Sequence, residues 1–287
     1  MSVSSLDTID CPNDAVAPPA DCPRLAIVVP CFNEEESLDR LVLEWHRLRQ
    51  ILAGQYEAEI LLVDDGSTDA TWQLLHDHFG DDPAARLIPH ETNRGIAAAI
   101  RTGLAHASAE IVASIDADCT YQPVQLVSLL ALMADDVDMV VASPYHPAGN
   151  VVGVAAWRLA LSRLASRLYA FVLRNQLHTY TSCFRVYRRS AVVDLPLSRG
   201  GFVGVVELLW QLDRRGGRIV ECPAVLSVRT TGQSKMRVAR TAFAHLGLLA
   251  QAAWQRLLGR RPSPFIHSNS DSILKSSPSS QLAPRTT

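Results

Sequence analysis

The first half of the chain repeats one pattern, in which a short apolar run is followed by a polar cluster and then by a stretch with helical periodicity. The apolar runs are residues 25–30 (LAIVVP), 59–63 (EILLV), 110–115 (EIVASI) and a weaker one at 86–88. Such runs, rich in β-branched residues, are typical of strands buried on both faces of a parallel sheet. Because they alternate with predicted helices, the pattern predicts an α/β fold with a mostly parallel, doubly wound sheet flanked by helices. These helices are expected from about Glu34, over 69–79 and over 96–107.

The second half has a different, α+β character and is expected to pack against the edge of this sheet. Its predicted helices are 151–173, 202–214 and 235–258, and its predicted strands are 184–187 and 218–228. No linker or internal repeat separates the halves, so we interpret residues 24–258 as one domain. Residues 1–23 are rich in Ser, Asp, Ala and Pro, and residues 259–287 in Ser and Pro, so we expect a disordered leader and a disordered tail.

The two halves of the chain differ strongly in net charge. Residues 1–150 carry seven basic and 24 acidic side chains, whereas residues 151–287 carry 20 basic and five acidic ones. We therefore expect the acidic half to hold a cation and the basic half to face phosphates or an anionic membrane. The six cysteines show no metal-binding spacing, and the chain shows neither a signal peptide nor an apolar run long enough to span a membrane. These features favour a cytoplasmic protein with reduced thiols.

Three polar clusters follow the predicted strands at their carboxyl ends, where parallel sheets bind ligands. Asp116 and Asp118 come directly after a buried strand, and two such carboxylates suit Mg²⁺ or Mn²⁺; capping of the next helix is the simpler alternative. Asp64 and Asp65 end the second strand, where a carboxylate can accept a hydrogen bond from a ribose or a base. The segment after the first strand, residues 30–34, offers a rigid turn, an aromatic ring and a carboxylate. We expect Asn33 to cap the first helix, and Ser67 or Thr68 to open the second.

Taken together, VVPCFNEEESL, LLVDDGSTDATW and ETNRGIAAAIRTGLAHASAEIVASIDADCTYQP resemble glycosyltransferase family 2, which has the GT-A fold. In the second half TSCFRVYRR, GFVGVVELLWQL and ECPAVLSVRTTGQSKM resemble the dolichyl-phosphate mannosyltransferase-like branch of that family. The resemblance covers roughly residues 24–245. It implies an inverting, metal-dependent enzyme that moves a hexose from a nucleoside-diphosphate sugar, a GDP- or UDP-hexose, to a polyprenyl phosphate of the dolichyl type.

The resemblance also implies roles for individual residues. Nucleotide contacts are implied for Pro30, Phe32, Glu34, Val63 and Asp65. Asp116, Ala117 and Asp118 would hold the ribose, diphosphate and metal, and Arg158, Arg229 and Lys235 match basic positions that meet the diphosphate or the acceptor phosphate. Of these, Asp116, Asp118, Arg158 and Lys235 are the implied catalytic residues. For each arginine, a solvated salt bridge is the alternative.

Two departures from the branch bear on these roles. Thr120 stands where the mannosyltransferases carry a metal-binding Gln, and its hydroxyl can still contact the metal, directly or through water. The chain has Ser143-Pro144-Tyr145 where they carry Ser-Arg-Tyr, so one basic contact is lost.

The proposed chemistry leaves two other readings open. A lipid phosphate is already anionic and needs no general base, whereas transfer to a hydroxyl does, and the second half offers few acids for that role. Glu207 is either such an acid or a structural one. A family member that acts on a hydroxyl in glycan or glycolipid synthesis is one alternative, and a non-catalytic nucleotide-sugar-binding scaffold is the other.

The last predicted helix favours peripheral attachment to the inner face of the membrane. Apolar side chains recur on one stripe, flanked by arginines: Phe243, Leu246, Ala250, Trp254 and Leu257. The competing interpretation is that this stripe packs on the domain itself. We expect an anionic membrane as a partner and no nucleic acid.

Overall fold

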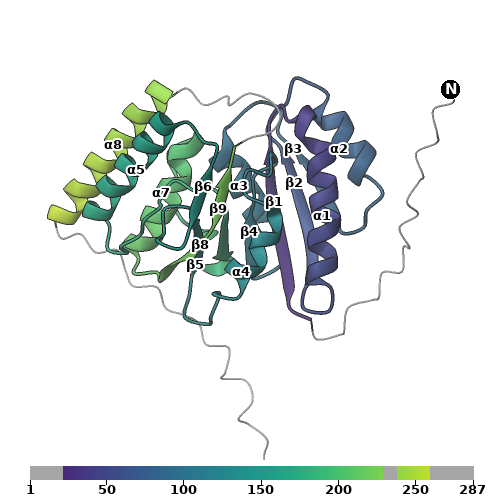
Figure 1. Ribbon diagram of the computed structural model, residues 1–287, viewed down its shortest axis with the longest axis horizontal. Coiled ribbons are helices and arrows are strands. Elements are labelled where there is room, and N and C mark those ends of the chain that lie inside the picture. The colour runs from purple at the N-terminus through teal and green to yellow at the C-terminus, as the bar shows by residue number, and fades with distance from the viewer. Residues whose placement is uncertain (1–21, 229–237, 259–287) are drawn as a thin grey trace, which may run out of the picture.

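The computed structural model describes residues 22–228 and 238–258 (Figure 1). Its centre is a seven-stranded sheet in the order β3-β2-β1-β4-β7-β5-β8. The strands are β1 (Arg24–Cys31), β2 (Glu57–Asp64), β3 (Ala85–Pro89), β4 (Ile111–Ser114), β5 (Met139–Ser143), β7 (Arg185–Arg188) and β8 (Ile219–Pro223). Only β7 runs antiparallel to its neighbours in this sheet, β4 and β5. The predicted α/β fold with a mostly parallel sheet is confirmed.

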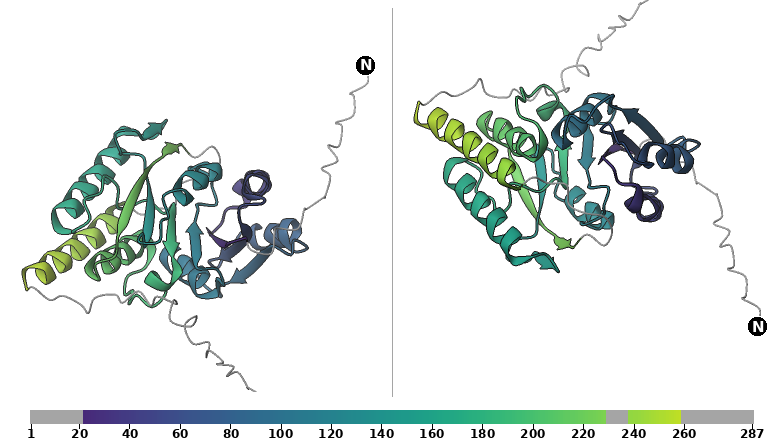
Figure 2. Two further views of the ribbon diagram at one scale, coloured as in Figure 1. Left: turned by 90° about the horizontal axis from the view of Figure 1, so that it is seen from below. Right: turned by 90° about the horizontal axis from the view of Figure 1, so that it is seen from above.

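Helices cover both faces of the sheet. They are α1 (Leu38–Leu52), α2 (Thr71–Phe79), α3 (Ile96–His106), α4 (Leu126–Leu130), α5 (Ala156–Val172), α6 (Arg189–Val192), α7 (Gly201–Arg214) and α8 (Val238–Leu257), with 3-10 turns at Glu35–Ser37 and Pro123–Gln125. The core on one face is built by α1, α2 and α4, and the core on the other by α3 and α7. The helices α5 and α8 lie side by side outside α7 (Figures 1 and 2).

The strand β1 shows why the apolar runs form buried strands. Its residues Leu25 to Val29 are all fully buried, and alternate side chains enter the two opposite cores. A strand that is covered on both faces is apolar along its whole length rather than at every second residue.

The structure corrects the boundaries predicted in the second half. Residues 151–152 belong to a short strand, β6 (Asn150–Val152), which pairs in parallel with β9 (Val225–Ser227). The predicted helix at 151–173 therefore begins only at Ala156. Between them Gly153 has a φ of +75°, a conformation that ends the strand and cannot belong to an α-helix. The predicted strand at 218–228 is divided into β8 and β9.

Two predicted helix caps are also wrong, because the side chains bond between loops instead. Asn33 has a φ of +52°, and its side-chain oxygen accepts a hydrogen bond from the Thr68 N–H at 2.7 Å. The Ser67 hydroxyl accepts one from the Asn33 N–H at 2.8 Å. α1 begins at Leu38 and α2 at Thr71, neither with a side-chain cap. The segments predicted as a leader and a tail lie almost wholly outside the described residues.

Candidate active site

The loops that follow β1, β2 and β4 share one edge of the sheet, because these strands are parallel and β1 lies between the other two. The first two loops are bonded to each other, since the Glu34 N–H donates to the Thr71 hydroxyl at 2.7 Å. The three polar clusters found in the sequence are therefore brought together at the carboxyl ends of the strands, where open α/β sheets bind their ligands.

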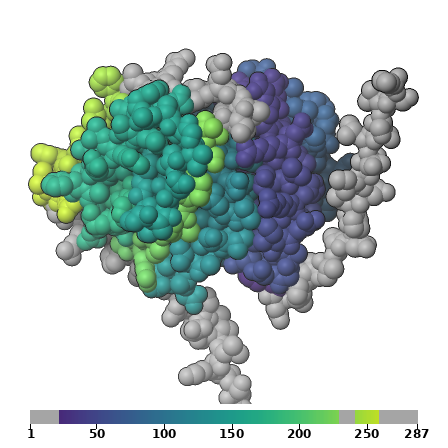
Figure 3. Space-filling view, viewed as in Figure 1, coloured from purple at the N-terminus to yellow at the C-terminus, as the bar shows by residue number. Residues whose placement is uncertain are grey.

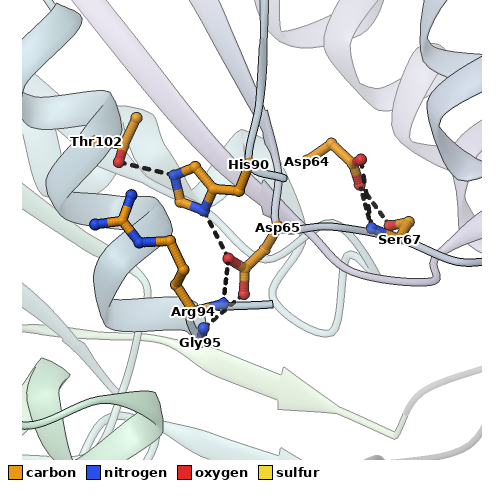
Figure 4. Close-up of polar contacts among 7 residues, drawn as sticks. All are labelled: Asp64, Asp65, Ser67, His90, Arg94, Gly95 and Thr102. Carbon is orange, nitrogen blue, oxygen red and sulfur yellow. Dashed lines mark hydrogen bonds and ion pairs between the residues drawn. The ribbon is translucent and has the colours of Figure 1, made fainter. Parts of the chain in front are cut away.

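Asp65 lies at the centre of a buried hydrogen-bond network at this edge (Figure 4). Its carboxylate accepts hydrogen bonds from the backbone N–H groups of Arg94 at 2.9 Å and Gly95 at 2.7 Å. The His90 Nδ1 lies 2.7 Å from the same carboxylate, and its Nε2 lies 2.9 Å from the Thr102 hydroxyl. The side chains of His90 and Asp65 are only 4% and 3% exposed. Asp65 thus clamps the end of β2 to the loop that leads into α3; we name this arrangement the Asp65 clamp.

The predicted nucleotide contacts fall into two groups in the structure. Val63 is fully buried, and Asp65 is occupied by the clamp. Pro30, Phe32 and Glu34 are partly exposed at the same edge, where a ligand can reach them. Contact of these five residues with a nucleotide stays a prediction.

A pocket of about 220 Å³ lies beside the residues that follow β4. It is lined by Asp116, Asp118, Thr120, Tyr121, Pro144, Tyr145, Ser162, Thr179, Thr181, Ser182, Cys183, Phe202 and Leu226. These residues come from the loops after β4 and β5, from α5, from the segment before β7, and from the beginning of α7 and β9. Its chemistry combines two carboxylates with several hydroxyl groups.

Burial disfavours the ionised form of the two carboxylates of this pocket. Burial raises the pKa of Asp116 to about 7, with a further contribution from the negative charge of Asp118. Burial also raises the pKa of Asp118, against the opposing effects of its hydrogen bonds with Thr120 and of the positive charge of Arg40. The Thr120 N–H donates to Asp118 Oδ1 at 3.0 Å. A cation between these groups would relieve both penalties.

The residues present fit a divalent ion that prefers oxygen ligands. In the described part of the chain no group of three or more His, Cys, Asp or Glu side chains is arranged to hold a metal. Asp116 and Asp118 would supply two hard oxygen ligands to such an ion, and Thr120 lines the same pocket. Mg²⁺ typically takes one or two carboxylates and completes its shell with water and substrate phosphates. The donor set therefore suits Mg²⁺ or Mn²⁺.

The basic residues predicted for the site are only partly accounted for. Arg158 is exposed near the beginning of α5, one turn before the pocket residue Ser162, and its guanidinium lies 5.2 Å from the centre of the Trp157 ring. Arg158 is not among the residues that line the pocket. Arg229 and Lys235 lie outside the described residues.

Glu207, which the sequence left open between two roles, makes structural contacts. It is 1% exposed, and its carboxylate accepts hydrogen bonds from the N–H and hydroxyl of Ser198 and from the N–H of Arg199. It thereby fastens the segment before α7 to that helix.

Sequence reasoning missed the hydroxyl-bearing wall of the pocket. Thr179, Thr181 and Ser182 come from the segment before β7, and Ser162 comes from α5. The Ser162 and Thr181 hydroxyls lie 3.1 Å apart. The available signal was the run TYTS at residues 179–182, in which three of four side chains carry an aliphatic hydroxyl.

Comparison with known proteins identifies the class that this fold and site define. The model of the family described as Glycosyl transferase family 2 matches residues 26–195, and the chain belongs to this family. It is a glycosyltransferase with the GT-A fold.

Similarity to individual proteins is more specific. The chain is 30% identical over 220 residues to "Polyprenol monophosphomannose synthase" of Mycolicibacterium smegmatis, covering 74% of this chain and 81% of that protein. It is also 30% identical to "Undecaprenyl-phosphate mannosyltransferase" of Micrococcus luteus, covering 74% of this chain and 87% of that protein. Glucosyl-3-phosphoglycerate synthase from Mycobacterium tuberculosis, solved with Mn²⁺ and UDP, has a similar fold, with a TM-score of 0.57 and 22% identity over 85% of this chain and 81% of its own.

Proposed function

We propose that the protein transfers a hexose from a nucleoside-diphosphate sugar, a GDP- or UDP-hexose, to a polyprenyl phosphate. The transfer inverts the anomeric carbon and uses Mg²⁺ or Mn²⁺. The observation that carries this proposal is the pocket itself, which combines Asp116 and Asp118 with a wall of hydroxyl groups. The names of the two mannosyltransferases to which the chain is similar support a polyprenyl phosphate as the acceptor.

The distribution of carboxylates favours an anionic acceptor. Among the residues that the structure describes, Asp116 and Asp118 are the only acids that line the pocket. The buried acids of the second half are occupied elsewhere: Glu207 by the segment before α7, Asp213 by the N–H groups of Arg174 and Asn175. A hydroxyl acceptor needs a general base within hydrogen-bond reach, whereas a phosphate monoester is already ionised.

In the proposed reaction an oxygen of the acceptor phosphate attacks the anomeric carbon from the side opposite the leaving group. A new C–O bond forms as the bond between that carbon and the nucleoside diphosphate breaks, and the electron pair of that bond leaves with the diphosphate. Asp116 and Asp118 would hold the divalent ion, which supplies electrostatic stabilisation of the charge that develops on the diphosphate. The wall that contains Ser162 and Thr181 would hydrogen-bond the acceptor phosphate or the sugar.

The deciding experiment pairs each GDP- and UDP-hexose with a polyprenyl phosphate or the corresponding polyprenol, with Mg²⁺ or Mn²⁺ present. We expect nucleoside diphosphate to be released only with the phosphate and only when metal is present. The anomeric configuration of the product, read by NMR, is expected to be opposite to that of the donor. Transfer to the alcohol but not the phosphate would establish the hydroxyl-acceptor alternative, and binding of nucleotide sugar without turnover of any acceptor would establish the scaffold.

We further propose that α5 and α8 attach the protein to the cytoplasmic, inner face of a membrane. The stripe predicted on α8 faces outward: Phe243, Leu246, Trp254 and Leu257 are 75%, 54%, 63% and 82% exposed. This favours the attachment over packing of the stripe on the domain itself. None of the helices in the described ranges has the length and apolar character to cross a membrane.

Polar side chains of α8 face the protein instead. His245 Nδ1 lies 2.9 Å from the Tyr169 hydroxyl, and Gln251 accepts a hydrogen bond from Arg199 at 2.8 Å. Arg256 donates to the carbonyl oxygens of Phe171 and Val172 at the end of α5. Apolar side chains of α8 also enter the core, where Leu248, Leu249 and Ala252 are buried. Both kinds of contact hold the helix on the domain and leave the stripe of exposed apolar residues outside.

The neighbouring helix α5 extends this surface. Its exposed apolar residues recur at spacings of four and three: Trp157, Leu161, Leu164, Leu168 and Phe171. The two helices lie beside each other, and in the space-filling view they form the side of the molecule away from α1 (Figures 1 and 3). The helix α5 also carries three arginines and no acid, which suits an anionic lipid surface.

Sedimentation with phosphatidylglycerol vesicles tests the attachment. Trp254→Ser together with Phe243→Ser should reduce the bound fraction severalfold without lowering the melting temperature, because both side chains are exposed. Leu43→Ser is the matched control, since Leu43 is 68% exposed on α1, at the opposite side of the molecule. Equal vesicle binding by wild type and the double variant would refute the proposal.

A further inference from the structure

Arg163 is one of the three arginines of α5, and it lies beside the pocket. Its guanidinium carbon is 5.1 Å from the centre of the Tyr145 ring, within the range of a cation–π contact. Tyr145 lines the pocket, and so does Ser162, the residue before Arg163. The arginine is thus tied to two elements of the pocket, α5 and the loop after β5.

The charge of Arg163 has no acidic partner within the described part of the chain. Arg49 and Arg86, by contrast, form ion pairs with Asp82 and Glu59. Arg163 is exposed to solvent and rests on an aromatic ring, so its N–H groups stay available to a ligand. The ring restricts the motion of the guanidinium and reduces the entropy lost when it binds.

The position of Arg163 complements the two carboxylates of the pocket. Asp116 and Asp118 line it from the loop after β4, whereas Ser162 lines it from α5, which carries Arg163, and Tyr145, whose ring Arg163 contacts, lines it from the loop after β5. An anion held near α5 would therefore meet a cationic side chain, and one held near the carboxylates would need a bridging metal. The pocket thus has two carboxylates in one part of its wall and a cationic side chain beside another part.

We propose that Arg163, positioned by Tyr145, binds the phosphate of the acceptor. This inference rests on the proposed function, since it names the residue that recognises the acceptor. Arg163 takes part in no bond making or breaking. It neutralises charge on the phosphate oxygens that do not attack, and it can do so with two parallel N–H bonds, as arginine does with phosphates.

Calorimetric titration with geranyl monophosphate, in the presence of Mg²⁺ and GDP or UDP, tests the inference directly. Geraniol serves as the uncharged ligand. We expect wild type to bind the phosphate and not the alcohol, and Arg163→Gln to weaken binding of the phosphate at least tenfold. Tyr145→Leu, which removes the ring but not the charge, should weaken it less. The affinity for the nucleotide should be unchanged in Arg163→Gln.

Arg167→Gln is the matched control, because Arg167 is another exposed arginine of α5, one turn further on. Neither arginine lines the pocket itself, but Arg163 contacts the ring of the pocket residue Tyr145, and in the described part of the chain Arg167 makes no such cation–π contact. Its affinity for geranyl monophosphate should lie within twofold of wild type. Vesicles of phosphatidylglycerol without any prenyl phosphate separate the two sources of phosphate. If Arg163 serves the acceptor, Arg163→Gln and Arg167→Gln should bind these vesicles equally.

Each other outcome counts against the inference in a distinct way. Equal binding of geranyl monophosphate by wild type and Arg163→Gln refutes the role of Arg163 and leaves the proposed function intact. A loss of vesicle binding alone assigns Arg163 to lipid headgroups, and a loss of nucleotide affinity assigns it to the donor. If wild type binds no prenyl phosphate, the proposed function fails together with the inference.

Discussion

Replacing Asp65 by asparagine tests the Asp65 clamp with the smallest possible change of shape. The two carboxylate oxygens accept from Arg94 N–H and His90 on one side and from Gly95 N–H on the other. An amide has only one oxygen. In either orientation the NH₂ group of the amide faces at least one N–H donor. Both of these buried donors, the NH₂ group and the N–H, then lack an acceptor.

The expected cost follows from these two unpaired groups. A buried polar group without a partner costs about 1–3 kcal/mol, so Asp65→Asn should lower the free energy of unfolding by about 2–6 kcal/mol. For a protein of this size that corresponds to a fall in melting temperature of roughly 4–24 °C.

Urea denaturation followed by circular dichroism measures this difference. Asp81→Asn is the control, because Asp81 is exposed and no ion pair involves it in the described part of the chain. Asp81→Asn should change the free energy of unfolding by no more than about 0.5 kcal/mol. An Asp65→Asn variant that unfolds with the same midpoint as Asp81→Asn would refute the clamp.

Three further predictions concern the pocket, α8 and α7. Asp118→Asn should slow transfer by several kcal/mol, roughly a thousandfold or more, because an amide is a poorer ligand for a divalent ion; circular dichroism should show an intact fold, and near-native turnover would contradict the metal assignment. Burial lowers the pKa of His245, so below about pH 6.5 the unfolded chain takes up a proton that the folded chain refuses, and stability falls as the pH falls. His245→Gln should show a smaller loss between pH 7.5 and 5.5 in urea titrations, and an identical loss would contradict this. Glu207→Gln should lower the free energy of unfolding by about 1–3 kcal/mol and leave the turnover of folded enzyme unchanged, whereas a fall in turnover alone would make Glu207 catalytic.

The fold of the first half could be predicted from the sequence because buried parallel strands are apolar throughout. The run 25–30 and the observed β1 differ by one residue at each end. The role of Asn33 could not be predicted, because its partner Thr68 lies 35 residues away on another loop. Sequence patterns predict such a residue to cap the helix that follows it. In the folded protein its side chain accepts a hydrogen bond from Thr68 instead.

The site shows the same division between local and distant signals. Asp116 and Asp118 were found because both follow one strand directly. Asp65 forms hydrogen bonds with His90 and with the loop before α3, which lie at least 25 positions away in the sequence. Local sequence patterns do not reveal such contacts. The stripe on α8 was predicted correctly as a stripe, but its orientation was not determined, since the partners of its polar face, such as Tyr169, come from other elements.

The antiparallel strand β7 has a consequence for how the chain is made. It lies between β4 and β5 in the sheet, although some 40 residues separate it from β5 in sequence. During synthesis from the N-terminus, β1 to β4 can therefore pair first, and one edge of β4 stays open until Arg185–Arg188 has left the ribosome. An open strand edge invites pairing with another chain, so a nascent or truncated product that stops before β7 should aggregate. A cut between the acidic and the basic half would thus separate β4 from its partner β7, so the two halves are not independent modules.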